Sequence, residues 1–211
     1  MSEFWAAREF RLDLSKRNLL MGVLNVTPDS FSDGGQFFDP EKAVERGLRM
    51  AEEGADIIDV GGVSTRPGAS VVGVEEQIRR IESVIGALAR NLKVPVSADT
   101  TDADVASAAL DAGASILNDI SGLANDPGIA RLAAASGAGL VIMHMRGTPA
   151  TMQSFTHYDD LFGEIFDFLL AGIRKASEAG VRPEQIVIDT GIGFSKTAEQ
   201  NMEILAALEF L

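Results

Sequence analysis

The sequence of 211 residues contains no cysteine, and its only histidines are His144 and His157. The absence of cysteine excludes a disulfide framework and a thiolate metal site. With two histidines, a zinc site built from imidazole and carboxylate ligands is not expected either. These absences remove thiol chemistry and the common zinc sites from the candidate functions.

Positive charge and long apolar runs are also scarce. The chain has 18 Lys and Arg against 31 Asp and Glu, a formal net charge of −13, which argues against a nucleic-acid or anionic-membrane partner. A small phosphorylated ligand would need local cationic side chains, backbone N–H groups or a metal. No run approaches the roughly 18–20 residues of a membrane span, and the N-terminus lacks the apolar core of a signal peptide. We therefore expect a cytoplasmic protein.

Six short apolar runs, rich in Val, Ile or Leu, follow a polar N-terminal lead. Runs without polar alternation are typical of strands buried on both faces. Helical patterns separate them, and capping residues are expected at Asp39, with Pro40 after it, and at Asp126, with Pro127 after it. This alternation predicts one domain over 1–211, with a parallel sheet and helices outside. The runs are 19–25, 55–62, 94–100, 114–120, 139–145 and 185–191.

Almost every apolar run ends in a chemically useful side chain. A (β/α) barrel gathers its strand ends around one mouth, whereas an open doubly wound sheet spreads them along an edge. We therefore predict a TIM (β/α)8 barrel with about six of its eight βα units present. Because a full barrel takes about 250 residues and open edges are a liability, we expect a C-terminally truncated piece of a longer enzyme. A genuine six-stranded open sheet is the alternative. The strand-end residues are Asn25, Asp59, Asp99, Asn118, Asp119, His144 and Asp189.

The loop 25–35 (NVTPDSFSDGG) is longer than the roughly 2–6 residues that a plain connection needs. The side-chain oxygen of Asn25 at the strand end could ligate a hard cation such as Mg²⁺. Phe31 is costly in an exposed loop unless something covers it, which favours a functional loop. The alternative is that Asx turns and ordinary turn chemistry explain the residues of this loop.

The loop 61–70 (GGVSTRPGAS) offers hydroxyl and guanidinium donors at Ser64, Thr65 and Arg66. Such donors suit a phosphate or a carboxylate. The alternative is a solvated turn that carries one surface arginine.

Asp99, Asn118 and Asp189 each end an apolar run, where polar groups are costly to bury unless they are paired. Together they could accept hydrogen bonds from the amino and ring N–H groups of a flat heterocycle. The alternative is that Asp99 and Asn118 are N-caps of the helices that follow.

The loop 189–197 (DTGIGFSKT) places an aromatic side chain, Phe194, near the strand end. Lys196 either supplies a cation or is a solvated residue at the start of a helix. For His144 we favour a hydrogen-bonded structural role over that of a general base. Met143 either gives soft apolar contact at a pocket floor or packs in the core.

These loops taken together resemble dihydropteroate synthase, a (β/α)8 enzyme family of folate biosynthesis. The resemblance spans essentially the whole chain and rests on an ordered set of motifs. The motifs are MGVLNVTPDSFSDGG, STRPGA, SADT, ILNDISG, MHMRGTP and IDTGIGFSKT. The family joins 6-hydroxymethyl-7,8-dihydropterin pyrophosphate to 4-aminobenzoate, giving 7,8-dihydropteroate and pyrophosphate.

The resemblance implies roles for the residues that match the family motifs. Asn25 would ligate the Mg²⁺ that holds the pyrophosphate. The pterin ring would be held by Asp99, Asn118 and Asp189, with Met143 packed beside it. The full-length form would be a homodimer, as relatives usually are.

The two early loops would carry the catalytic residues of this family. Thr65 and Arg66 would belong to a loop that closes over the substrate, and Asp33 would order the first loop. The resemblance places the aminobenzoate pocket at Phe31, Pro67 and Phe194.

The sequence departs from the family pattern at several positions. Val63 stands where the family usually has Glu, and Thr190 and Ser195 where it commonly has Pro and Gly. The Ser-Arg-Lys and Arg-x-His motifs of the later strands do not occur, so we expect little synthase activity from these 211 residues alone. The alternatives are a pterin-binding methyltransferase domain, an inactive fragment or paralogue that only binds pterin, and an unrelated barrel that binds a sugar phosphate.

Overall fold

The structure is a computed structural model that describes residues 3–27, 39–63 and 72–210. Within these ranges a six-stranded sheet forms the centre of the fold, and each neighbouring pair of strands is parallel. The strands lie side by side in chain order, with β3 and β8 at the edges. They are β3 (Met21–Asn25), β4 (Ile57–Gly61), β5 (Val96–Asp99), β6 (Ile116–Asp119), β7 (Gly139–Met143) and β8 (Ile186–Asp189).

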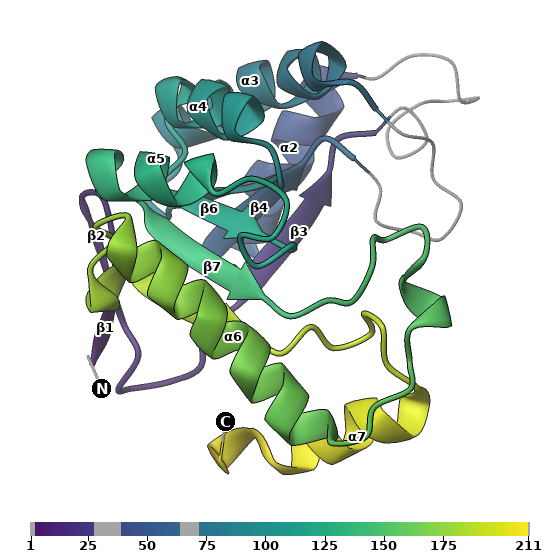
Figure 1. The fold of residues 1–211 in the computed structure, drawn as a ribbon. Coiled ribbons are helices and arrows are strands. Elements are labelled where there is room, and N and C mark those ends of the chain that lie inside the picture. The colour runs from purple at the N-terminus through teal and green to yellow at the C-terminus, as the bar shows by residue number, and fades with distance from the viewer. Residues whose placement is uncertain (1–2, 28–38, 64–71, 211) are drawn as a thin grey trace.

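Helices α2 to α6 lie around the outer side of the sheet (Figure 1). Sequential order with helices outside is the winding of a (β/α) barrel, and a doubly wound sheet would instead reverse its strand order. The structure therefore confirms six βα units of the predicted barrel. The helices are α2 (Pro40–Glu52), α3 (Val74–Asn91), α4 (Ala103–Ala112), α5 (Gly128–Ser136), α6 (Leu161–Glu178) and α7 (Ala198–Ala206), and 3₁₀ turns occupy Met152–Ser154, Pro183–Gln185 and Leu208–Phe210.

The main core lies between the sheet and the outer helices. Strand residues that point outward alternate with residues that point to the concave inner face, as the two-residue period of a strand requires. Leu24, Ile58 and Ile142 are outward-pointing and buried against helix residues such as Ile81 and Leu88. Functional side chains are therefore expected on the opposite, inner face of the sheet.

Both carboxylates that were expected to cap helices accept N–H groups of a first helical turn. The Asp39 carboxylate caps α2 by accepting the N–H groups of Glu41 and Lys42. Asp126 also caps the start of α5, because its carboxylate accepts from the N–H of Gly128 at 2.7 Å, although the helix boundary places the N-cap position at Pro127. Asp126 also accepts from the N–H of Ala103 at 3.1 Å, which ties α5 to α4.

The N-terminal segment is not a polar lead. It forms an antiparallel hairpin of β1 (Phe4–Ala7) and β2 (Phe10–Asp13), which is not among the predicted strands. Trp5 is buried and donates its indole N–H to the carbonyl of Gln185 at 2.8 Å. It packs with Ile57 and Ile116 on the inner face, near the beginnings of the strands. The hairpin thus fills the end of the inner face opposite the strand ends that carry polar groups.

No helix in the described ranges is both long enough and apolar enough to cross a bilayer.

Candidate functional site

Polar side chains on the inner face lie close together at the carboxyl ends of β3, β4 and β5. Asn25 is the register partner of Gly61, and Gly61 is the register partner of Asp99. A Cβ atom on Gly61 would lie 3.3 Å from Oδ2 of Asp99 and 3.5 Å from Oδ1 of Asn25. A glycine at position 61 therefore leaves room for the amide and the carboxylate to approach one another from either side.

Asp99 and Asn118 are register partners on β5 and β6. The alternative interpretation of these residues as N-caps is wrong, because Asp102 caps α4 and α5 begins after Pro127. The two polar groups thus face the inner side of the sheet with no helix terminus to satisfy. This is the arrangement expected of ligand-binding groups.

The carboxylate of Asp119, also at a strand end, accepts its hydrogen bonds from the turn that follows the strand. It points away from the inner face and accepts from the Ser121 N–H at 2.8 Å, the Ser121 hydroxyl at 2.7 Å and the Leu123 N–H at 2.8 Å. These three bonds fix the turn after β6. Asp119 therefore acts on the site only through its charge.

A buried carboxylate, Asp59, lies behind the Asp99–Asn118 pair. It is 3% exposed, and its Oδ2 accepts from Nδ2 of Asn118 at 3.1 Å. Within the described ranges, three buried atoms of this cluster have no hydrogen-bond partner: Asp59 Oδ1, Ser97 Oγ and Asn118 Oδ1. Buried unpaired polar atoms are costly, and a binding site is where such atoms gain partners from a ligand.

The two carboxyl groups of this cluster hold protons more tightly than usual. Burial raises the pKa of Asp59, opposed by the hydrogen bond from Asn118. Burial, followed by the charges of Asp59 and Asp119, raises the pKa of Asp99 well above its usual value. A carboxyl group of this kind can act as a hydrogen-bond donor or acceptor, depending on which one a ligand requires.

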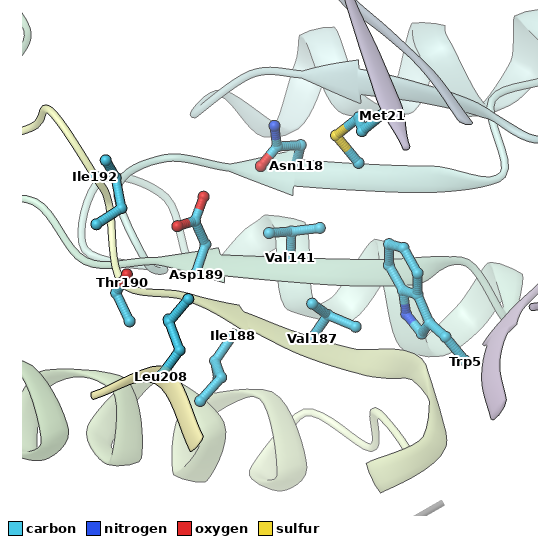
Figure 2. Close-up of a pocket in the computed structure, with 10 residues that line it drawn as sticks. All are labelled: Trp5, Met21, Asn118, Val141, Val187, Ile188, Asp189, Thr190, Ile192 and Leu208. Carbon is cyan, nitrogen blue, oxygen red and sulfur yellow. The ribbon is translucent and has the colours of Figure 1, made fainter. Parts of the chain in front are cut away.

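Asp189 ends β8 next to a cavity of about 360 Å³ (Figure 2). Its Oδ1 accepts from the Gly191 N–H at 2.7 Å, and its side chain is exposed. Asn118 lines the same cavity, so the structure brings these two predicted ligand groups together, and register places Asp99 beside Asn118. The cavity is lined by Trp5, Met21, Asn118, Val141, Val187, Ile188, Asp189, Thr190, Ile192 and Leu208.

Met143 and Phe194 belong to one apolar cluster beside the polar groups. Met143 is 2% exposed and packs with Ile120 and Met145, and Phe194 lies against this cluster. Because Met143 is the register partner of Asp189, the cluster adjoins the cavity wall at the end of β8. The structure therefore brings two more of the predicted site residues together.

Lys196 is buried, so its interpretation as a solvated helix-start residue is wrong. Its Nζ lies 3.0 Å from Nδ1 of His144, and it donates to the carbonyls of Gly191 and Phe194, also at 3.0 Å. Gly191 permits this turn, since its φ is +69° and a Cβ atom there would lie 2.0 Å from the His144 carbonyl oxygen. From the sequence alone, Lys196 could be interpreted either as a cation in the site or as a solvated residue. The sequence did not predict its burial or its contact with His144.

His144 is hydrogen-bonded and buried, as its predicted structural role requires. It is 1% exposed, and its ring stands edge-on to Phe168 at a centroid distance of 4.9 Å. Burial, then the charges of Lys196 and Arg146, lower its pKa to about 3. Burial is also the main reason that the pKa of Lys196 falls to about 8.

The loops after β7 and β8 are joined by hydrogen bonds around Ser195. Its hydroxyl accepts from the Arg146 N–H at 3.1 Å and donates to the Phe194 carbonyl at 2.7 Å. The Tyr158 hydroxyl donates to the Ser195 carbonyl at 3.0 Å and lies 3.2 Å from its Oγ. Arg146 stacks on the Tyr158 ring, 4.0 Å from its centroid, and forms an ion pair with Glu164. These contacts hold Phe194 and Lys196 in place.

Five predicted residues, Phe31, Asp33, Thr65, Arg66 and Pro67, lie outside the described residues. In the ranges that the structure covers, no group of three or more His, Cys, Asp or Glu side chains could hold a metal ion. Asn25 is exposed at the end of β3, and its amide oxygen is a single ligand of the kind that hard cations prefer.

Residues 21–211 match the family of pterin binding enzymes. The chain is 50% identical over 196 residues to the dihydropteroate synthase of Synechocystis, covering 93% of this chain and 68% of the relative. It is 44% identical over 197 residues to that of Escherichia coli, covering 93% of this chain and 69% of the relative.

Solved structures agree with these relatives. A Xanthomonas albilineans dihydropteroate synthase with 4-aminobenzoic acid matches with a TM-score of 0.90 and 43% identity, covering 100% of this chain and 74% of that one. A complex of the X. albilineans enzyme with 7,8-dihydropteroate matches with a TM-score of 0.79 and 41% identity, over 92% of this chain and 68% of that one. The chain therefore belongs to the pterin-binding enzyme family, and within it to the dihydropteroate synthases.

Proposed function

We propose that this chain carries the pterin site of a dihydropteroate synthase, which joins 6-hydroxymethyl-7,8-dihydropterin pyrophosphate to 4-aminobenzoate and releases pyrophosphate. One observation carries the proposal most directly. Asp99 and Asn118 are register partners at neighbouring strand ends, and Asn118 shares a cavity with Asp189. Acid and amide groups in this arrangement suit a flat heterocycle that carries several N–H donors.

The pterin ring binds, in this proposal, between the polar strand ends and the apolar cluster of Met143. Asp99, Asn118 and Asp189 accept from the amino and ring N–H groups, and Met143 supplies apolar contact. The raised pKa of Asp99 supports this role. Its carboxyl group can donate a hydrogen bond when protonated and accept one when ionised, so it can pair with either tautomer of the ring.

Asn25 is the proposed protein ligand of Mg²⁺. Its amide oxygen fits a hard cation, and one protein ligand suffices where substrate phosphates and water complete the shell. When bound, Mg²⁺ would neutralise the charge that develops on the leaving pyrophosphate.

The remaining roles follow the motifs of the family. Thr65 and Arg66 bind the pyrophosphate and close over it, and Asp33 orders the first loop. Closure excludes water, which would otherwise compete with the aminobenzoate amine for the methylene carbon. No nucleophile of the protein is required, in keeping with a chain that lacks cysteine. The proposed aminobenzoate pocket comprises Phe31, Pro67 and Phe194.

The proposal includes a cytoplasmic, homodimeric full-length protein that acts on small molecules and binds neither nucleic acid nor membranes. The net charge of −13 supports the last point, because it opposes binding to polyanions. Light scattering on the full-length protein tests the dimer.

The proposal is tested by the release of pyrophosphate and the formation of dihydropteroate, measured on the full-length protein and on this chain with both substrates and Mg²⁺. We expect turnover by the full-length protein and binding of the pterin pyrophosphate by both. An Asp99→Asn variant should lose binding and turnover together. Full turnover by that variant, or a full-length protein that forms no dihydropteroate, would contradict the proposal.

A further inference from the structure

The contact between Asp59 and Asn118 spans three strands. Asp59 lies on β4 and Asn118 on β6, with β5 between them, yet Asp59 Oδ2 accepts from Asn118 Nδ2 at 3.1 Å. Side chains of next-nearest strands can meet in this way only on the concave face of a curved sheet, where inward-pointing groups converge.

The small side chain of Ser97 makes this contact possible. Ser97 is the register partner of Asp59 on β5 and lies two residues before Asp99, which is the register partner of Asn118. The side chain of Asp59 extends across β5, on the inner side of Ser97, to Asn118, which lies two residues further towards the carboxyl ends of the strands. A larger residue at position 97 would occupy the path of this hydrogen bond.

The contact determines which atom of the Asn118 amide is free. An amide offers two N–H donors at Nδ2 and an acceptor at Oδ1. Because Oδ2 of Asp59 accepts from Nδ2, that nitrogen is held at Asp59, and Oδ1 has no partner within the described ranges. In Figure 2 the Asn118 oxygen is turned towards the side of the cavity where Asp189 lies, and the nitrogen is turned away. Asn118 Oδ1 is therefore a buried acceptor that only a hydrogen-bond donor can satisfy.

We propose that Asp59 is a positioning residue that makes the site selective for a heterocycle edge rich in N–H donors, by fixing the orientation of the Asn118 amide. The inference rests on the proposed function and deepens it, since the ligand class becomes 2-amino pteridines in preference to 2-oxo pteridines. Asp59 itself does not touch the ligand.

The physical basis of the selectivity is the mismatch between two acceptors. A 2-amino group donates to Oδ1 of Asn118, whereas a 2-oxo group would face Oδ1 with a second lone pair. Sites built to hydrogen-bond a donor reject analogues that leave the buried acceptor unpaired. If the amide were free to rotate, Nδ2 could turn to the 2-oxo group, and the preference would fall.

The test measures dissociation constants of 6-hydroxymethylpterin and 6-hydroxymethyllumazine for the chain and for Asp59→Leu, which keeps a similar shape without an acceptor. We expect the wild-type chain to bind the pterin more tightly than the lumazine. In Asp59→Leu the ratio of the two dissociation constants should fall at least about tenfold. Asp59→Asn, which can hold the amide in either orientation, should also lower the ratio. It serves as the test if Asp59→Leu does not fold.

A double variant separates positioning from a purely structural role. In Asp59→Leu with Asn118→Asp, measured at alkaline pH so that residue 118 is ionised, both oxygens of residue 118 are acceptors, so no wrong orientation exists and the preference for the pterin should return. Asp59 variants that weaken both ligands equally, leaving the ratio unchanged, would overturn the inference while leaving the proposed function intact. A wild-type chain that binds neither pteridine would overturn the proposed function, and this inference with it.

Discussion

Nζ of Lys196 lies 3.0 Å from Nδ1 of His144, and both side chains are buried. Because an ammonium group only donates, Nδ1 is the acceptor and the imidazole proton lies on Nε2. The pair holds the loop after β8 against the end of β7. It is also stable only while His144 stays neutral, which gives the fold a specific pH dependence.

Acid should destabilise the protein through His144. Its pKa is about 3 in the folded chain and about 6.5 in an unfolded one, so the unfolded state binds the extra proton between these values. The free energy of unfolding therefore falls as pH drops below 6.5, by at most about 1.4 kcal/mol per pH unit from this group. His144→Asn keeps an acceptor that does not titrate. In urea unfolding between pH 7 and 4, the free energy of unfolding of this variant should fall less steeply than that of the wild type. An equal fall in the free energy of unfolding for both proteins would contradict the prediction.

Lys196 should make the stability of the protein depend on pH in the alkaline range. Its pKa of about 8 lies below its ordinary value of 10.5, so the unfolded state binds more protons between pH 8 and 10.5. Stability contributed by this group rises with pH over that window. Lys196→Met lacks the rise, and we expect the stability difference between wild type and variant to change between pH 7.5 and 10. Arg146 and Asp189 are present in both proteins, so a constant difference would rule out Lys196 as the titrating group.

Tyr158 and Ser195 should act as one unit in holding Phe194. Tyr158→Phe removes the hydroxyl that bonds Ser195, and Ser195→Ala removes the acceptor for the Arg146 N–H. Each change should cost about 1 kcal/mol and, in the full-length protein, raise the KM for aminobenzoate more than it lowers kcat, if Phe194 lines that pocket. The double variant should cost less than the sum, because the two hydroxyls share a contact. Strict additivity would show that the two residues are independent.

The packing of α6 on β7 can be tested at Gly172. A Cβ atom there would lie 2.7 Å from Cγ2 of Ile142 and 3.3 Å from the carbonyl of Gly122. We expect Gly172→Ala to lower the free energy of unfolding by about 1–3 kcal/mol. Gly73→Ser is the control, since no atom lies within 4 Å of a Cβ at this N-cap position, and serine should be neutral or stabilising there. Equal stability of the two variants in urea would contradict this account of the interface.

The sheet was predictable because parallel strands buried on both faces leave a strong signal in the sequence. The six apolar runs correspond to β3–β8 with ends shifted by up to two residues, and the cap at Asp39 follows from local chemistry. The hairpin of β1 and β2 was missed because each strand has four residues, and Trp5 is buried partly by residues far along the chain such as Ile116 and Val141.

The strand-end residues of the site were predictable, but their contacts were not. Asp99, Asn118 and Asp189 could be named because each ends an apolar run. The bond from Asn118 to Asp59 crosses a whole strand and depends on sheet curvature, which no local pattern encodes. Burial of Lys196 depends similarly on the turn at Gly191 and on three acceptors from two loops.

The most direct test of the pterin site is the affinity of the chain for 6-hydroxymethylpterin, compared with Asp99→Asn and with Asp111→Asn as an exposed control on α4. The account predicts that Asp99→Asn weakens binding at least about tenfold, equivalent to about 1.4 kcal/mol, and that Asp111→Asn binds like the wild type. Equal affinity of the Asp99→Asn variant and the wild-type chain would contradict it.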